Sequence, residues 1–341
     1  MWIIGCDYHP SFQRIAMMNT EGGEYRRLRL EHVGEAEQFY RGLAGEAVRV
    51  GMEASGHSRW FEALLAELGM ELWIGHPSAI RAAAPRKQKT DARDAAHLLR
   101  LLESGQFEGM RIRVPTAEEW DVRQLVLHRH RLVEIRTRVK NQLRSMAVNQ
   151  GMGRKPGLWS RKGQEQFREL RLPPWTSRRR QDNLELLEQL RERTAPLDQA
   201  VMEEAARRPE VARLQTHPGV GPITALAFVL TLGEAQRFAG GKQVASYLGL
   251  IPAEHSSGGR QRLGHITKQG NALVRGLLVE AAHSAVLRDA ELGRCYHRLA
   301  MRKNRSIAMV AVARKLAVRL WWMWKRGLNY GEWRASGSHA G

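Results

Sequence analysis

Four acidic residues in the first third of the chain have the types and positions that a metal-dependent nuclease-type site needs. They are Asp7, Glu53, Asp91 and Asp94. Asp7 and Glu53 each end an apolar run, and a carboxylate at the end of a buried strand is held at the sheet edge, where open α/β folds bind ligands. Asp91 and Asp94 are three residues apart on an expected helix, which points both carboxylates to one face. If the four converge, their oxygens form a cage suited to Mg²⁺.

A second group of reactive side chains lies in a glycine-rich loop. Residues 256–259 are Ser-Ser-Gly-Gly, and the nearby cations are Arg260, Arg262 and Lys268. Such a loop could place a serine hydroxyl against a phosphodiester, with the cations stabilising charge on the phosphorus oxygens. An ordinary surface turn uses the same residue types, so both interpretations stay open.

Charge is distributed unevenly along the 341 residues. The chain carries 54 Lys and Arg against 35 Asp and Glu, a net charge of +19. Residues 1–85 hold 8 basic and 11 acidic side chains, a net charge of −3, which leaves +22 for residues 86–341. An acidic unit joined to a strongly basic remainder suits a metal-holding catalytic domain carried by domains that bind nucleic acid.

Composition bounds the class of protein. The length predicts two or three domains. Two cysteines far apart in sequence, Cys6 and Cys295, argue against a disulfide framework or a zinc cluster and suit a reducing cytoplasm. No signal peptide is expected, and residues 308–324, interrupted by three cations, are predicted to form a buried or interface helix rather than a membrane span.

The carboxylates require a scaffold, and the apolar patterns supply one. They predict strands over residues 2–8, 13–19, 24–30, 48–53 and 70–74, with helices over 33–44 and 59–68. This order of elements is that of the ribonuclease-H-like (RuvC-like) α/β fold, in which acids on the first strand, the fourth strand and a later helix meet at one site. Composition alone indicates only an α/β protein.

The middle of the chain is predicted to be helical. Thr116 and Glu119 form a capping box that begins a long helix. Apolar residues recur every seven positions there, at Leu125, Leu132, Val139 and Met146, with Ile135 and Leu143 between them. A coiled-coil-like stripe and a single amphipathic helix of a bundle both fit so few heptads.

A basic insertion or hairpin tip is expected to follow over residues 151–181. Its cations, predicted to contact nucleic acid, include Arg178, Arg179 and Arg180. Residues 183–207 are predicted to form a second helix that pairs with the first, and Pro196 should break or kink it.

The segment Pro218-Gly219-Val220-Gly221 lies between two helical patterns and is similar to the hairpin of helix-hairpin-helix modules. Glycines there let backbone amides approach a phosphate at a helix N-terminus. A tight turn between two helices would use similar residues. In so basic a chain, we favour phosphate contact through Gly219 and Gly221.

Taken together, the motifs resemble one family over nearly the whole chain. The acidic blocks are Gly5-Cys6-Asp7, Gly51-Met52-Glu53-Ala54-Ser55-Gly56 and Lys89-Thr90-Asp91-Ala92-Arg93-Asp94-Ala95. The later blocks are Pro218-Gly219-Val220-Gly221, Tyr247-Leu248-Gly249-Leu250-Ile251-Pro252, Ser256-Ser257-Gly258-Gly259 and Gly264-His265-Ile266-Thr267-Lys268-Gln269-Gly270. The combination resembles the DEDD transposases of bacterial insertion sequences, the insertion-sequence 110 family, also called bridge-RNA-guided serine recombinases.

The resemblance implies that Asp7, Glu53, Asp91 and Asp94 coordinate Mg²⁺ and that Ser257 is the nucleophile. The adjacent Ser256 is its rival. It also implies double-stranded DNA and a noncoding guide RNA as partners, and a tetramer, a dimer of dimers, in which one subunit's carboxylates complete a site with another's serine. Such a recombinase would act in the bacterial cytoplasm at the nucleoid.

The expected domains are a ribonuclease-H-like domain over residues 1–108, a long-helix region over 115–207, a mostly α transposase domain over 208–330 and a flexible tail over 331–341. Two other functions compete with the recombinase: a junction-resolving nuclease that uses metal-activated water, and a non-catalytic nucleic-acid scaffold. A covalent protein–DNA adduct separates the first from the second, and metal dependence separates the second from the third.

Overall fold

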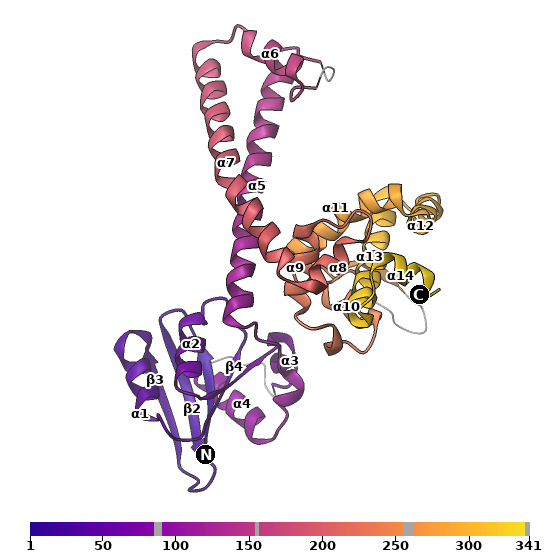
Figure 1. Ribbon diagram of the computed structural model, residues 1–341. Coiled ribbons are helices and arrows are strands. Elements are labelled where there is room, and N and C mark those ends of the chain that lie inside the picture. Colours follow the sequence, from indigo (N-terminus) through magenta and orange to yellow (C-terminus); the bar gives the residue numbers. More distant parts are fainter. Residues whose placement is uncertain (85–90, 154–156, 255–261, 338–341) are drawn as a thin grey trace. The chain divides into compact units, whose positions relative to one another are not determined.

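The computed structural model describes residues 1–84, 91–153, 157–254 and 262–337, apart from the side chains of Asp91 and Ala92. The chain divides into two units, Met1–Val114 and Pro115–Gly341 (Figure 1). In the described ranges the first unit is mixed α/β, and the second is helical apart from one short strand pair. This confirms the predicted α/β N-terminal part and mostly helical remainder.

A five-stranded sheet forms the centre of the first unit. Its strands, in spatial order, are β3 (Tyr25–Glu31), β2 (Phe12–Asn19), β1 (Trp2–Tyr8), β4 (Val48–Glu53) and β5 (Glu71–Gly75). β1, β4 and β5 are parallel, whereas β2 runs antiparallel to both of its neighbours. β1 and β4 are buried over most of their length, which explains why their sequences are continuous apolar runs. The five predicted strands are confirmed, each to within one residue at either end.

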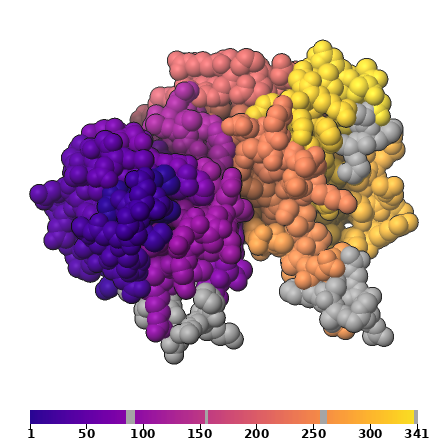
Figure 2. Space-filling model, turned by 90° about the horizontal axis from the view of Figure 1, so that it is seen from below, coloured from indigo at the N-terminus to yellow at the C-terminus, as the bar shows by residue number. Residues whose placement is uncertain are grey.

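Helices cover both faces of this sheet. α1 (Glu37–Gly42) and α2 (Arg59–Glu67) share a core with Ile4, Cys6 and Met52, while α3 (Pro77–Ala82) and α4 (Asp91–Glu103) share a core with Ile3 and Trp73 on the other face. Figure 2 shows this unit as a continuous rounded body in indigo and purple. The predicted helix over residues 33–44 is only partly formed, because Gly34 has a φ of 88° inside a distorted turn before α1.

The second unit begins with a helical hairpin of α5 (Ala117–Asn149), α6 (Arg161–Glu169) and α7 (Pro174–Ala206), in which α6 lies at the tip (Figure 1). The capping box of Thr116 and Glu119 is confirmed. The predicted break at Pro196 is wrong, because α7 continues through it. Proline removes one backbone hydrogen bond, and packing against α5 along the hairpin supports the helix.

The heptad stripe on α5 is largely confirmed. Val139 and Met146 are buried in a core at the hairpin tip, and Leu132 packs against it. Leu125 instead packs against the core of the C-terminal helices. Ile135 does not belong to the stripe, since its side chain is 38% exposed.

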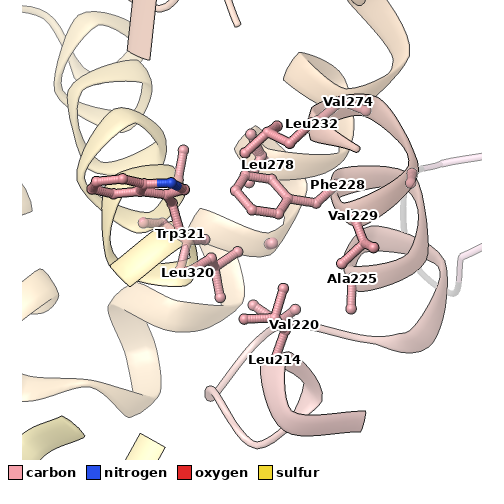
Figure 3. Close-up of a cluster of buried hydrophobic side chains, with 14 of the residues drawn as sticks. Leu214, Val220, Ala225, Phe228, Val229, Leu232, Val274, Leu278, Leu320 and Trp321 are labelled. Atoms are coloured by element: carbon pink, nitrogen blue, oxygen red, sulfur yellow. The ribbon is translucent and has the colours of Figure 1, made fainter. Parts of the chain in front are cut away.

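The rest of the unit is a cluster of helices around an apolar core. The helices are α8 (Pro209–Gln215), α9 (Pro222–Leu232), α10 (Gly241–Tyr247), α11 (Ala272–Arg288), α12 (Ala290–Ala300), α13 (Arg305–Arg326) and α14 (Tyr330–Ala335), and the strand pair is β6 (Pro252–Glu254) with β7 (Leu263–Ile266). Phe228 of α9, Leu278 of α11 and Trp321 of α13 meet in this core (Figure 3). The predicted buried helix over residues 308–324 is therefore confirmed. No helix in the described part of the chain is long and apolar enough to cross a membrane.

Candidate active site

The carboxylates of Asp7 and Glu53 lie at the same edge and on the same face of the sheet. The parallel pairing of β1 with β4 ends at Cys6 opposite Met52, so Asp7 and Glu53 come next on neighbouring strands. A Cβ added at Gly5 would meet the backbone of α4, and one added at Gly51 would meet Leu102 of α4. Because side chains alternate between the faces of a strand, Asp7 and Glu53, two residues further on, point to the α4 face as well.

Helix α4 brings Asp94 to that face. A Cβ at Gly5 would lie 2.3 Å from the amide nitrogen of Leu99 and 2.4 Å from the carbonyl oxygen of Ala95, so only glycine allows α4 to pack this closely on β1. Asp94 precedes Ala95 directly and is partly buried. Its Oδ2 is buried and has no hydrogen-bond partner among the described residues. A buried carboxylate oxygen without a donor is an acceptor suited to a cation.

Three polar side chains surround the two strand-end carboxylates. His9 Nε2 lies 3.1 Å from Asp7 Oδ2, and Arg81 of α3 places Nη2 3.5 Å from Glu53 Oε1. Arg14 on β2 lies opposite Asp7 in the antiparallel register of β1 and β2. The Asp7 side chain is 21% exposed and that of Glu53 40%, so both can be reached from solvent. The edge can therefore receive a phosphate with cations already beside the carboxylates.

The residues present fit a divalent cation, although the described side chains alone do not complete a cage. Asp7, Glu53 and Asp94 carry hard oxygen atoms of the kind that Mg²⁺ prefers, and the buried Oδ2 of Asp94 has no hydrogen-bond partner among the described residues. The described residues contain no group of three His, Cys, Asp or Glu close enough to hold a metal. The side chain of Asp91, the fourth predicted ligand, lies outside the description.

A groove of about 600 Å³ runs beside Asp94 on the α4 face. It is lined by Arg93 and Arg100 of α4, Arg27 of β3 and Tyr25, together with Asp94 itself. Three arginines from two elements, Arg27, Arg93 and Arg100, therefore line the groove that Asp94 also lines. Such an arrangement suits a phosphate-bearing strand that runs past a metal site.

The predicted serine nucleophile and its rival lie outside the described residues, as does Arg260. Ser257 and Ser256 belong to the segment that joins β6 to β7, two strands that pair antiparallel. Arg262 and Lys268 are described and exposed, and Lys268 has a φ of 56°.

The base of the serine loop is held by close backbone contacts. A Cβ at Gly249 would lie 2.2 Å from the carbonyl oxygen of Gln269, and one at Gly270 would lie 2.1 Å from that of Tyr247. Arg275 of α11 donates hydrogen bonds to the carbonyl oxygens of Leu248 and Gly270, at 3.3 and 3.2 Å. These contacts fix both ends of the loop against α11.

The hairpin before α9 is locked by a buried polar network. His217 is buried, and burial lowers its pKa to about 4. Arg319 of α13 contacts both His217 and Asp289, and Tyr330 donates a hydrogen bond of 2.6 Å to Asp289. Burial raises the pKa of Asp289, but the hydrogen bonds it accepts and the Arg319 charge outweigh this and lower it overall.

Close packing against α11 explains why residue 219, in the turn before α9, is a glycine. A Cβ at Gly219 would lie 2.7 Å from the Ala281 carbonyl oxygen and 2.7 Å from the Ala285 amide nitrogen, both of α11. Gly221 is exposed and begins α9 without a side-chain cap, so its end of the hairpin has room for an anion.

The three arginines predicted to contact nucleic acid from the α5–α7 hairpin, Arg178, Arg179 and Arg180, differ in their surroundings. α7 begins at Pro174, earlier than predicted, so the arginines lie on a helix rather than in a loop. Arg178 contacts Asp182 at 2.8 Å, and Arg180 donates to the carbonyl oxygens of Phe167 and Leu170 at 2.8 and 3.0 Å. Arg180 thus ties the end of α6 to α7, whereas Arg179 is exposed.

Comparison with known proteins covers both units. Residues 4–149 match a DEDD-type family profile of the IS110 class, described as transposase, and residues 211–298 match the profile described as transposase IS116/IS110/IS902 family. A Pseudomonas aeruginosa protein named "Probable family 20 transposase" is 30% identical over 89% of this chain and 93% of its own length. A Coxiella burnetii protein, "Transposase for insertion sequence element IS1111A", is 28% identical over 82% of this chain and 78% of its own length.

The chain belongs to the IS110 transposase family. As an insertion-sequence transposase it acts on the DNA of element ends, and its DEDD domain implies dependence on a divalent metal ion. The segment matched by the first profile includes the four predicted acidic residues, and the segment matched by the second includes Ser256 and Ser257.

Several cations of the transposase escaped the sequence interpretation. Arg14, Arg81 and the groove residue Arg27 are scattered over separate elements, with no local motif. Strand register would have found Arg27, because its pairing with Ala16, itself opposite Gly5, puts it on the α4 face.

Proposed function

We propose that this transposase cuts and rejoins DNA strands with Mg²⁺ held by Asp7, Glu53, Asp91 and Asp94 and with a serine nucleophile. The observation that carries the proposal is the common face shared by Asp7 and Glu53, on which α4 packs and where the Oδ2 of Asp94 in α4 is buried without a hydrogen-bond partner among the described residues. The strand order and directions around this edge also favour a ribonuclease-H-like fold for the first unit.

In the proposed reaction, the Ser257 oxygen attacks the phosphorus of the DNA backbone. A bond from that oxygen to phosphorus forms as the bond to the leaving strand's oxygen breaks, and the serine proton passes to solvent or to that oxygen. A metal ion held by the carboxylates would polarise the phosphate and stabilise negative charge on the attacking and leaving oxygens. The serine link retains a phosphodiester bond, so rejoining needs no ATP. Reversal of the step by a new strand's hydroxyl completes the transfer.

The cations have two proposed tasks in this reaction. Arg27, Arg93 and Arg100 would hold the strand in the groove beside Asp94. Arg262 and Lys268 flank the serine loop and, with Arg260, would neutralise the phosphorus oxygens. We further propose that Gly221 and Arg179 contact double-stranded DNA or the noncoding guide RNA, and that the transposase works as a dimer of dimers. The α5–α7 hairpin and residues 208–330 would then have separate tasks within one compact unit, and Trp333 of α14, in the expected tail, is buried in the core of that unit.

The competing proposal is a nuclease in which water, not serine, attacks. The carboxylate edge supports it equally well, because it would serve either nucleophile. A suicide DNA substrate, nicked so that rejoining fails, separates the two: the recombinase accumulates a denaturant-resistant adduct, and the nuclease releases free ends.

Serine variants identify the residue. Ser257→Ala should abolish the adduct and recombination, whereas Ser256→Ala, the matched control, should reduce them only mildly, since one hydroxyl lies in line with the leaving oxygen. Adduct lost only in Ser256→Ala would move the assignment by one residue. Adduct kept in both variants would overturn serine catalysis.

A further inference from the structure

The tip of the helical hairpin holds a pocket that the proposed chemistry does not use. It has a volume of about 660 Å³ and lies between α5, α6 and α7. Its lining combines an apolar floor, one tryptophan and several charged side chains: Leu158, Phe167, Leu184 and Leu187; Trp159; Arg136, Lys140, Arg168, Arg191, Glu185 and Glu188, with Gln164. This volume lies within the range of roughly 300–1,000 Å³ that small-ligand pockets occupy.

Trp159 is the wall of the pocket and is partly open to solvent. Its side chain is 38% exposed, and Lys140 Nζ lies 5.0 Å from the ring centroid. Next to it, Leu158 and Phe167 are buried in the core of the tip. A partly exposed aromatic ring next to buried apolar side chains offers a stacking surface.

The segment that carries Trp159 is held rigidly. Ser160 caps α6: its Oγ accepts from the Gly163 amide at 3.1 Å and donates to the Gly157 carbonyl oxygen at 2.7 Å. A Cβ at Gly163 would lie 2.3 Å from that same carbonyl oxygen, so the chain packs against itself as closely as glycine permits. Gln164 adds a hydrogen bond of 3.3 Å to the Trp159 carbonyl oxygen. The indole is therefore preorganised, which limits the entropy lost on binding.

The rim determines the chemical class of the ligand. Four cations from three helices, Arg136, Lys140, Arg168 and Arg191, line the pocket, and Arg191 lies 3.9 Å from Glu188. Two carboxylates, Glu185 and Glu188, stand among them and can accept hydrogen bonds from exocyclic amino groups of bases. Binding of a helix from a second copy would require a continuous apolar surface around the pocket. The four cations instead provide positive charge that complements the phosphates of a nucleic acid.

We propose that this tip pocket binds one unpaired nucleotide of a nucleic acid strand, with the base stacked on Trp159 and its flanking phosphates held by the four rim cations. Bases in a duplex already stack on each other, so only an unpaired or extruded base exposes a face to the indole. Unpaired RNA and unpaired DNA share this chemistry. The inference rests on the proposed function only in requiring a nucleic acid partner.

The test compares two tryptophan variants of the full chain. Trp159→Ala should weaken binding of a fluorescently labelled single strand on the order of tenfold, the scale of one lost stacking contact, while Trp159→Phe restores most of it. The matched control is Trp175→Ala, which removes a tryptophan that is 85% exposed on the same hairpin but outside the pocket. Each protein is titrated with single-stranded RNA, single-stranded DNA and blunt duplex DNA of one sequence. Thermal unfolding first establishes that each variant has the same unfolding midpoint as the wild type.

The outcomes separate the sources. If Trp159→Ala loses affinity only for RNA, the pocket is assigned to RNA, and if it loses affinity only for single-stranded DNA, the pocket is assigned to DNA. Loss of affinity for both strands supports the general proposal. Equal losses in Trp159→Ala and Trp175→Ala, or equal losses for duplex and single strands, would overturn it. So would a changed oligomeric state of Trp159→Ala with unchanged affinity, which would indicate a second copy as the occupant. Catalysis is tested apart, since the suicide-substrate adduct needs serine and metal, and its failure leaves these titrations interpretable.

Discussion

The carboxylate edge and the serine loop belong to one proposed reaction but are built in different ways. Asp7 and Glu53 follow from sheet register, which is determined over whole strands. The loop is anchored at its base by two glycines, Gly249 and Gly270, in backbone contact with the facing segment. Regular elements position the metal ligands, whereas a few local contacts position the ends of the loop. The two regions should therefore fail differently when perturbed.

The largest expected effect comes from the carboxylates. Asp7→Ala, Glu53→Ala or Asp94→Ala should reduce strand cleavage about a thousandfold or more, because each removes a proposed metal ligand and metal stabilisation contributes several kcal/mol. DNA binding should stay within about twofold, since cations supply the affinity. Glu67→Ala, which removes an exposed acid paired with Arg41, is the control. Near-normal cleavage by the Asp7 variant with Mg²⁺ present would refute the metal site.

The second effect is an acid sensitivity expected of the helical unit. The folded pKa of His217, about 4, lies below its usual 6.5, so the unfolded chain binds the extra proton. Stability is then fully present above pH 6.5 and is lost as pH falls toward 4, by up to about 3 kcal/mol. Denaturant unfolding at pH 7 and pH 4.5 should show this loss, and His217→Gln should reduce it. If His217→Gln loses as much unfolding free energy between pH 7 and pH 4.5 as the wild type, the acid sensitivity comes from other groups.

A third effect tests how tightly α4 must pack. Gly5→Ala forces a methyl group against the Leu99 and Ala95 backbone, so it should lower stability by about 1–3 kcal/mol and also impair cleavage by displacing Asp94. Gly22→Ala, at a position with open space around it, should do neither. Thermal unfolding and cleavage assays measure both. A stable and active Gly5 variant would show that α4 can shift without harm to the site.

A fourth effect separates backbone strain from steric contact at the base of the serine loop. Gly249 and Gly327 share a positive φ, of 65° and 69°, but only Gly249 has a neighbouring backbone within reach of a Cβ. Gly327→Ala should cost about 1 kcal/mol from backbone strain, and Gly249→Ala about 1–3 kcal/mol more. Recombination should fall only in the Gly249 variant. Equal effects on recombination would mean that the loop base does not position the loop.

The sequence allowed the strands and the acids at their ends to be predicted, because buried parallel strands form apolar runs that end in polar residues. It did not allow the closeness of α4 to β1 to be predicted, since that depends on Gly5 meeting a helix some ninety residues later. Arg180 shows the opposite error: a basic run suggested nucleic acid, but its guanidinium ties α6 to α7. Pro196 was expected to break or kink the second helix, but α7 continues through it and packs against α5.

One measurement joins the two regions most directly: mass spectrometry of the DNA–protein adduct trapped on a suicide substrate, with Mg²⁺ and with a chelator. The account predicts that, with Mg²⁺, the wild-type protein yields a DNA-linked peptide whose modified residue is Ser257, and that both the chelated sample and Asp94→Ala yield none. An adduct that forms without metal, or efficient cleavage that never links DNA to serine, would contradict the claim that carboxylates and serine act in a single reaction.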